Sequence, residues 1–199
     1  MIKKEKTFVL IKPDGVQRSL IGETIKRLER TGLKLVALKL MLADADKIKQ
    51  HYLLEDGWIE KTGNKSIKAL ASKGIDVTGK DPKKVGEEIL ANLVKYLGAG
   101  PVVTMVWEGA HAVAIVRKIV GATEPLSSDV GTLRGDFMID SYELADVDKR
   151  AVRNILHASS SPKEAESEIA LWFDKRDVLN YRLVQEQIIY DVNLDGILE

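Results

Sequence analysis

One histidine stands where the local sequence could support chemistry. His157 follows the apolar run Asn154-Ile155-Leu156, and a helix is expected to begin just after it, near Pro162. The N-terminal amides of such a helix would point toward the space beside the imidazole, which makes a natural anion site. A neutral imidazole can attack phosphorus when a carboxylate holds its other nitrogen and cations neutralise the phosphate. Glu168, on the second turn of that helix, is placed to be this carboxylate, although a buried structural histidine fits the same local pattern equally well.

Two other patterns could carry chemistry and are weaker. Gly74 to Lys80 has the glycine and lysine spacing of a phosphate-binding P-loop, but Asp81 stands where the magnesium-binding Ser or Thr belongs, and no buried apolar strand precedes the segment. It is better interpreted as a surface loop that caps the next helix. His51, His111 and His157 lack an HExxH or cysteine partner pattern, so a structural metal site is not expected.

The composition limits the class of protein that positions these residues. Of 199 residues, 45% are apolar and 30% are charged, and 30 basic side chains balance 30 acidic ones. These values are typical of one globular domain without a net charge for nucleic acid or an anionic membrane. The chain has no cysteine, which excludes disulfides and thiolate metal sites and suits a reducing compartment. Because the apolar runs are shorter than a membrane span, we expect a cytoplasmic protein.

The first part of the chain alternates strand and helix patterns. Residues 7–11 and 33–42 are apolar runs typical of strands, and the first ends at Lys12-Pro13-Asp14-Gly15. Between them, residues 22–30 have helical spacing with Gly32 as a left-handed cap, and Asp44 can cap a further helix to Leu54. Residues 55–80 are polar and rich in glycine, which predicts a surface excursion with only a weak helical signal.

The second part adds two helices and three strands. Asp81-Pro82 begins an amphipathic helix that runs to Gly98, and Ser161 to Glu164 forms a capping box before another helix. Residues 102–107 and 112–116, joined by 108–111, predict an antiparallel hairpin. A long loop is expected over 121–135, an exposed charged segment over 141–150 and a short strand over 154–156. Together these elements predict an α+β fold with an antiparallel or mixed sheet covered by helices.

Four segments considered together resemble the signatures of nucleoside diphosphate kinases and occur in that family's order. They are residues 7–18 (TFVLIKPDGVQR), 100–109 (GPVVTMVWEG), 130–137 (VGTLRGDF) and 154–159 (NILHAS). The resemblance implies a ferredoxin-like antiparallel sheet covered by helices and a single domain over residues 1–199. It also implies two surface insertions, at about 53–88 and 141–153, and a C-terminal extension at about 191–199.

The resemblance further implies a reaction and a role for each matching residue. The γ-phosphoryl group of a nucleoside triphosphate would pass to a nucleoside diphosphate by a ping-pong mechanism, with Mg2+ held mainly by the nucleotide phosphates. His157 would be the nucleophile that becomes phosphohistidine, Glu168 would orient it and Tyr52 would lie close to the transferred phosphate. The nucleotide-binding residues would be Lys12, Arg117, Thr123 and Arg134 at the phosphates, Asn154 at the sugar and Ile89 at the base.

Three positions depart from the family pattern. Ile89 stands where the family places an aromatic residue on the base, so base contact would be apolar packing without π-stacking. Ser160 replaces an expected Asp, and Val130 replaces an expected Pro. Ile89 and Ser160 leave open a catalytically weak nucleotide-binding regulatory scaffold of the same fold, and the segment from Gly74 to Lys80 leaves open a P-loop kinase. By family likeness we expect a homo-oligomer, hexamer or tetramer, with no membrane and no specific nucleic acid among its partners.

Overall fold

The computed structural model, which describes residues 4–191, is built on a four-stranded antiparallel sheet in the order β2-β3-β1-β4. The strands are β1 (Lys4–Ile11), β2 (Lys34–Met41), β3 (Val102–Ala110) and β4 (Leu156–Ala158). This is the strand order of a ferredoxin-like sheet, and the predicted α+β class is confirmed. The predicted C-terminal extension, residues 191–199, lies outside the described residues apart from Asp191.

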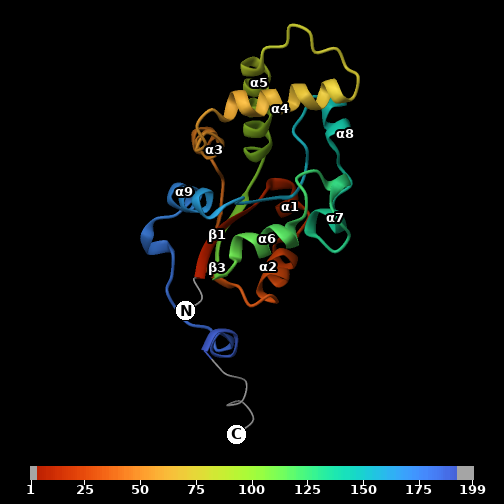
Figure 1. Cartoon of the computed structure of the whole chain (residues 1–199). Helices are drawn as coiled ribbons and strands as arrows, with labels where there is room; N and C mark the ends of the chain where they lie inside the picture. The colour runs from red at the N-terminus through yellow and green to blue at the C-terminus, as the bar shows by residue number, and fades with distance from the viewer. Residues whose placement is uncertain (1–3, 192–199) are drawn as a thin grey trace.

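Helices cover both faces of the sheet. They are α1 (Pro13–Gln17), α2 (Ile21–Glu29), α3 (Ala45–Tyr52), α4 (Trp58–Ser72), α5 (Pro82–Leu97), α6 (Ala112–Val120), α7 (Leu133–Phe137), α8 (Tyr142–Val147) and α9 (Pro162–Trp172). Figure 1 shows α2 and α6 on one side of the sheet and α3 and α9 on the other, while α4 crosses α5 at one end of the molecule. Within residues 4–191, every helix is too short or too polar to span a bilayer.

The predicted helix starts are confirmed at three capped positions. The side chains of Asp44, Asp81 and Ser161 each accept a hydrogen bond from a backbone N–H in the first turn of α3, α5 and α9. Each cap satisfies an amide that the helix itself leaves without a partner. The starts of the helices that carry Tyr52, Ile89 and Glu168 are therefore set by local sequence.

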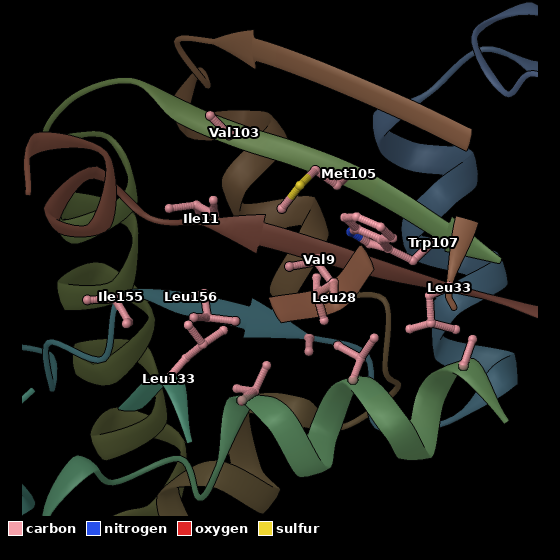
Figure 2. Close-up of a cluster of buried hydrophobic side chains, with 14 residues drawn as sticks. Val9, Ile11, Leu28, Leu33, Val103, Met105, Trp107, Leu133, Ile155 and Leu156 are labelled. Carbon is pink, nitrogen blue, oxygen red and sulfur yellow. The ribbon is translucent and has the colours of Figure 1, made fainter. Parts of the chain in front are cut away.

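Strand β1 contributes to two cores because its side chains alternate between the faces of the sheet. Val9 and Ile11 pack with residues of α2 and α6, and Figure 2 shows this cluster. Phe8 and Leu10 pack on the other face against α3, α5 and α9. All four side chains are at most 1% exposed. Since Leu10 pairs directly with His157 on β4, the candidate nucleophile stands on a strand pair that is fixed from both sides.

The predicted hairpin over residues 102–116 is wrong. Strand β3 continues to residue 110, His111 adopts a left-handed backbone with φ 54°, and the chain then forms α6. Ala112, Val116 and Val120 fall at four-residue steps and are at most 2% exposed, so this apolar run matches a helix face as well as a strand. The connection from β3 to β4 therefore begins with the helix α6.

Residues 55–80, predicted as a surface excursion, contain the 15-residue helix α4 packed on α5. Two glycines allow a close crossing: a Cβ on Gly63 would lie 1.8 Å from the carbonyl oxygen of Pro82, and one on Gly86 would lie 2.0 Å from that of Ile59. Glycine weakens the helical signal of a sequence, but here it lets two helix backbones meet. Residues 141–150, predicted as an exposed charged segment, likewise contain the short helix α8.

Candidate active site

A cavity of about 590 Å³ is bordered by α4 and α5, by α6 to α8 and by the segment that leads into β4. Its volume suits a small-molecule ligand. All of the predicted site residues except Glu168 line it, namely Lys12, Tyr52, Ile89, Arg117, Thr123, Arg134, Asn154 and His157. Glu168 is 1% exposed and lies behind His157 on α9. The P-loop-like segment from Gly74 to Lys80 contributes no residue to the lining.

His157 is held through one of its two ring nitrogens. Its Nε2 lies 2.5 Å from Oε1 of Glu168. The other oxygen of Glu168 accepts a hydrogen bond from Ser159 Oγ at 2.6 Å, and Ser159 Oγ itself accepts one from the backbone N–H of Phe8 at 3.1 Å. Within residues 4–191, Nδ1 of His157 has no hydrogen-bond partner. The arrangement fixes the ring and leaves Nδ1 as the available nucleophilic nitrogen.

The surroundings keep His157 neutral. Burial and the nearby positive charges of Lys12, Arg134 and Arg117 lower its pKa to about 3. Burial also raises the pKa of Glu168 above its ordinary value. A neutral imidazole has the lone pair that a nucleophile needs, so this histidine is ready to attack an electrophilic centre at neutral pH.

A series of polar contacts holds the side chain of Lys12 at the cavity. Its Nζ donates to Oδ1 of Asn154 at 2.7 Å and lies 4.9 Å from the centre of the Tyr96 ring. The amide Nδ2 of Asn154 donates in turn to the backbone oxygen of Thr123 at 2.8 Å. Burial, and after it the charge of Arg134, lowers the pKa of Lys12 to about 7. An anion bound here would stabilise the charged form of Lys12.

The two arginines of the cavity differ in what they already bind. Arg134 is 7% exposed and donates to four backbone carbonyls, those of Asn154, Gly121, Ala122 and Leu156, at 2.6 to 3.2 Å. A guanidinium has five N–H donors, so one remains for a ligand. Arg117 is exposed on α6, and its guanidinium has no hydrogen bond or ion pair within the part of the chain that the structure describes. Arg134 therefore holds the loop to β4, while Arg117 is free to meet an anion.

The chain matches a known protein family over most of its length. The family model of nucleoside diphosphate kinase matches residues 5–62 and 59–178. A nucleoside diphosphate kinase from Pyrobaculum aerophilum is 48% identical over 179 residues, which cover 88% of this chain and 98% of that protein. The chain belongs to the nucleoside diphosphate kinase family. The predicted resemblance is confirmed, and so is the prediction that the chain is an enzyme of this class.

Solved structures of this family share the fold. That of an NDP kinase from Pyrobaculum aerophilum has a TM-score of 0.84 and 46% identity, and it covers 89% of this chain and all of its own. A second structure is a transition state mimic of the nucleoside diphosphate kinase from Borrelia burgdorferi with bound vanadate and ADP. It has a TM-score of 0.75 and 34% identity, and the match covers 93% of this chain and 96% of that one. The ferredoxin-like sheet of this chain is thus the family's fold.

In this nucleoside diphosphate kinase, the backbone is strained two residues before His157. Ile155 has a φ of 55°, a left-handed conformation that a β-branched residue rarely adopts. Its carbonyl accepts from the backbone N–H of Lys12 at 2.8 Å, and its N–H donates to Oδ2 of Asp14 at 3.2 Å. A Cβ on Gly15 would lie 2.8 Å from the same carbonyl. The loop after β1 therefore holds the segment that leads into His157 in a conformation that it would not adopt alone.

Two residues that are absent from the predicted site nevertheless support it, namely Ser159, described above, and His51. His51 is 5% exposed, and its ring lies 4.7 Å from that of His157 at an angle of 88°. Its Nδ1 accepts from Nε1 of Trp172 at 3.3 Å and lies 3.7 Å from Oε1 of Glu168. Burial lowers the pKa of His51 to about 3, so a neutral ring packs against the candidate nucleophile. Its position directly before Tyr52 is the one sequence signal that could have indicated this.

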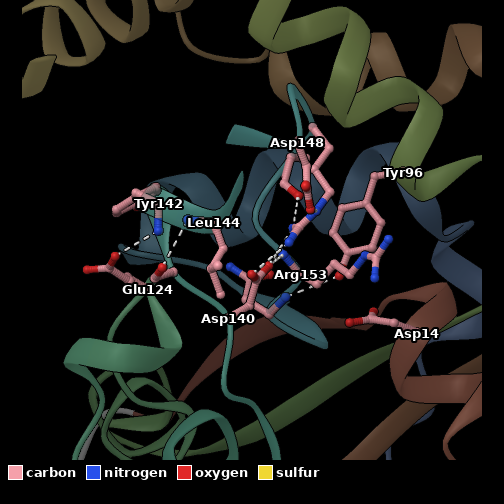
Figure 3. Close-up of polar contacts among 12 residues, drawn as sticks. Asp14, Tyr96, Glu124, Asp140, Tyr142, Leu144, Asp148 and Arg153 are labelled. Atoms are coloured by element: carbon pink, nitrogen blue, oxygen red, sulfur yellow. Dashed lines mark hydrogen bonds and ion pairs between the residues drawn. The ribbon is translucent and has the colours of Figure 1, made fainter. Parts of the chain in front are cut away.

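Residues 141–153, predicted as the second insertion, are fixed to the cavity wall by charged contacts, which Figure 3 shows. Arg150 donates to both oxygens of Asp140, at 2.6 and 2.9 Å, and the backbone N–H of Arg153 donates to the same carboxylate at 2.6 Å. At the start of α8, the backbone N–H of Tyr142 donates to Oε1 of Glu124 at 2.8 Å. Glu124 directly follows Thr123, and Arg153 directly precedes Asn154. These contacts therefore join α8 to two segments that carry predicted nucleotide-binding residues.

Proposed function

We propose that the chain transfers the γ-phosphoryl group of a nucleoside triphosphate to a nucleoside diphosphate by a ping-pong mechanism, through phosphohistidine at His157. The observation that carries this proposal is the pairing of His157 Nε2 with Glu168, which leaves Nδ1 unpaired beside a cavity with several cations. The lone pair of Nδ1 would form the bond to the γ-phosphorus as the bond to the β,γ-bridging oxygen breaks, and the nucleoside diphosphate would leave with that electron pair. A second diphosphate would then take the phosphoryl group by the reverse of this step.

The roles of the charged residues follow from their contacts. Glu168 would stabilise the positive charge that develops on the ring while Nε2 stays protonated. Lys12, Arg117 and the remaining N–H of Arg134 would neutralise the phosphate oxygens, with Thr123 supplying a hydroxyl. Preorganised cations are the main source of rate enhancement expected for phosphoryl transfer.

Three further residues complete the proposed site. Asn154 would contact the sugar while its amide keeps Lys12 in place, and Ile89 would pack against the base. Tyr52 would lie close to the transferred phosphoryl group, and burial keeps its hydroxyl protonated by raising its pKa above the ordinary value. As a donor without charge, it would contribute a hydrogen bond and no repulsion.

Magnesium would enter on the nucleotide. Within residues 4–191, His51, His157 and Glu168 are the one group of three side chains that could hold a metal ion together, and two of its three donors are nitrogens. Mg2+ prefers oxygen ligands and usually keeps waters and substrate phosphates in its shell. The residues of the cavity therefore fit an ion held mainly by the phosphates, where it would add positive charge opposite the transferred group.

A labelling experiment tests the reaction. The protein is incubated with γ-labelled ATP and Mg2+, and we expect a phosphoprotein that is labile in acid, stable in base and discharged by a nucleoside diphosphate. The regulatory-scaffold alternative predicts nucleotide binding without this intermediate. Label that is stable in acid, or that a diphosphate cannot discharge, would contradict the proposal.

Assembly and location extend the same proposal. We infer a single domain over residues 1–199 that forms a homo-oligomer, hexamer or tetramer, in the cytoplasm, where a chain without cysteine suits the reducing conditions. The family likeness supports the oligomer. Light scattering of the purified chain tests it, and a monomer at micromolar concentration would contradict it.

A further inference from the structure

The inserted helix α4 presents one continuous face to the cavity. Six residues of α4 and the residue that caps its end line the cavity: Trp58, Thr62, Lys65, Ser66, Ala69, Leu70 and Lys73. They follow one another at spacings of one, three or four residues, so they lie on one side of the helix. Another side, which includes Ile59 and Gly63, packs on α5. Since the stripe follows the whole length of the helix, α4 forms a wall of the cavity as well as cover for α5.

This wall packs on α5 in its first half and contacts α8 at its end. The glycine crossing of Gly63 and Gly86 holds α4 against the helix that carries Ile89. At the other end, Nζ of Lys73 lies 3.7 Å from Oδ2 of Asp146 on α8, so the two insertions meet there. In Figure 1, α4 spans the distance from the end of α3 to α8. A ligand in the cavity would therefore lie beside a fixed helix.

Trp58 is the large aromatic side chain on this face. It is half-buried, and its ring lies 5.5 Å from that of Tyr52, which in turn lies 5.1 Å from His51 beside the nucleophile. Trp58 is thus separated from His157 by two rings. Helix α5, on which α4 packs, contributes Ile89, Asn92 and Leu93 to the same lining. The walls from α4 and α5 thus offer aromatic and apolar surface, with Lys65 and Lys73 also on α4, whereas Lys12, Arg117 and Arg134 come from other elements of the lining.

We propose that Trp58 stacks on the nucleobase of the substrate, so that the inserted helix supplies the aromatic contact that Ile89 cannot make. The inference rests on the proposed function for the orientation of the nucleotide, with its phosphates at His157. A nucleobase has a flat π face of any identity, so an indole ring offers affinity without selecting one base. The other tryptophans cannot do this, because Trp107 and Trp172 are at most 2% exposed. Tyr142 of α8 is the competing aromatic residue in the lining.

Calorimetric binding to the full chain tests the inference with two ligands, ADP and inorganic tripolyphosphate, which has the phosphates without the nucleoside. We expect Trp58→Leu to weaken ADP binding about tenfold and Trp58→Phe by less than about threefold, since the phenyl ring still stacks. Tripolyphosphate affinity should stay within about twofold in both variants. Lys68→Ala, on an exposed face of α4 outside the lining, is the control and should bind ADP as the wild type does. Tyr142→Leu tests the competing aromatic residue and should weaken ADP binding less than Trp58→Leu does.

Three results would overturn the inference. They are unchanged ADP affinity in Trp58→Leu, an equal loss for ADP and tripolyphosphate, and a loss for Tyr142→Leu in place of Trp58→Leu. Thermal unfolding of each variant, together with the aromatic-retaining Trp58→Phe, separates lost stacking from a damaged fold. Failure of the proposed reaction would be seen separately, as missing label on the wild-type protein, and the comparison of the two ligands would still stand.

Discussion

Nε2 of His157 and Oε1 of Glu168 lie 2.5 Å apart, and Ser159 holds the second oxygen of the same carboxylate at 2.6 Å. This pairing decides which ring nitrogen is available and which group can share the charge that the ring gains. It also joins β4 to α9, two elements that the sequence brings together only through the short turn at Ser160 and Ser161.

Glu168→Gln should keep nucleotide binding and slow phosphoryl transfer by about 10²-fold, because a neutral amide can hold the ring but cannot stabilise its positive charge. Single-turnover labelling measures the transfer step, and calorimetry with ADP measures binding. Ser159→Ala is the matched control. It leaves the carboxylate charged and removes the hydrogen bonds of the Ser159 hydroxyl to Glu168 and from the Phe8 N–H, so its transfer rate should fall less than that of Glu168→Gln. Equal rates for Glu168→Gln and the wild type would mean that another group serves His157.

Two lysines separate the proposed site from the P-loop alternative. Lys12→Ala removes a buried cation that contacts Asn154 in the cavity, and it should reduce activity by about 10²-fold or more. Lys80 is exposed in the turn before α5 and does not line the cavity, so Lys80→Ala should be near normal. Steady-state exchange between two nucleotides measures both. A larger loss of activity in Lys80→Ala than in Lys12→Ala would contradict the proposed site and favour phosphate binding at the segment from Gly74 to Lys80.

The affinity for ADP should depend on pH through Lys12. With a pKa near 7 in the free protein, Lys12 loses its charge as the pH rises, while a bound phosphate favours the charged form. The dissociation constant for ADP should therefore rise about tenfold between pH 7 and pH 8.5. Lys12→Arg keeps its charge over this range and should show a flatter profile. A flat profile for the wild type would show that Lys12 stays charged without ligand.

His51 should make the fold sensitive to acid. Its pKa in the folded protein is about 3 and its ordinary value is 6.5, so between these values the unfolded chain binds the additional proton. The stabilisation is present above pH 6.5 and is lost as the pH falls toward 3, by up to about 1.4 kcal/mol of unfolding free energy per pH unit. Urea unfolding of the wild type and of His51→Gln from pH 4 to pH 8 measures this. The variant should have the shallower slope below pH 6 and the same slope above pH 7, and parallel curves throughout would contradict a buried neutral His51.

Local signals were sufficient for the elements that carry most of the site. The caps Asp44, Asp81 and Ser161 have side chains that meet the first amides of a helix, and such contacts do not depend on the rest of the fold. The run 112–116 predicts a strand wrongly, because five consecutive apolar residues fit the two-residue period of a strand and the 3.6-residue period of a helix. In the structure, one face of the helix α6 packs this run against β1. Pattern is reliable where chemistry within a few residues sets the structure.

The remaining parts of the site depend on contacts between distant segments. Helix α4 contains Gly63, which lowers helix propensity, and only its crossing with Gly86 shows why glycine stands there. His51 gives no motif of its own, since its place beside His157 results from the packing of α3 on α9. The four carbonyl contacts of Arg134 were equally hidden, because they come from loop segments on either side of α7 and from β4. Such features follow from the three-dimensional structure and not from spacing along the chain.

The most direct test of the account is to locate the phosphoryl group on the labelled protein. The wild type is incubated with ATP and Mg2+, and peptide mass spectrometry identifies the modified residue while 31P NMR of the intact phosphoprotein distinguishes the two ring nitrogens. We expect the phosphoryl group on Nδ1 of His157, because Nε2 is held by Glu168, and we expect none on His157→Ala. A phosphoryl group on Nε2, on another residue, or on the His157→Ala protein would contradict the account.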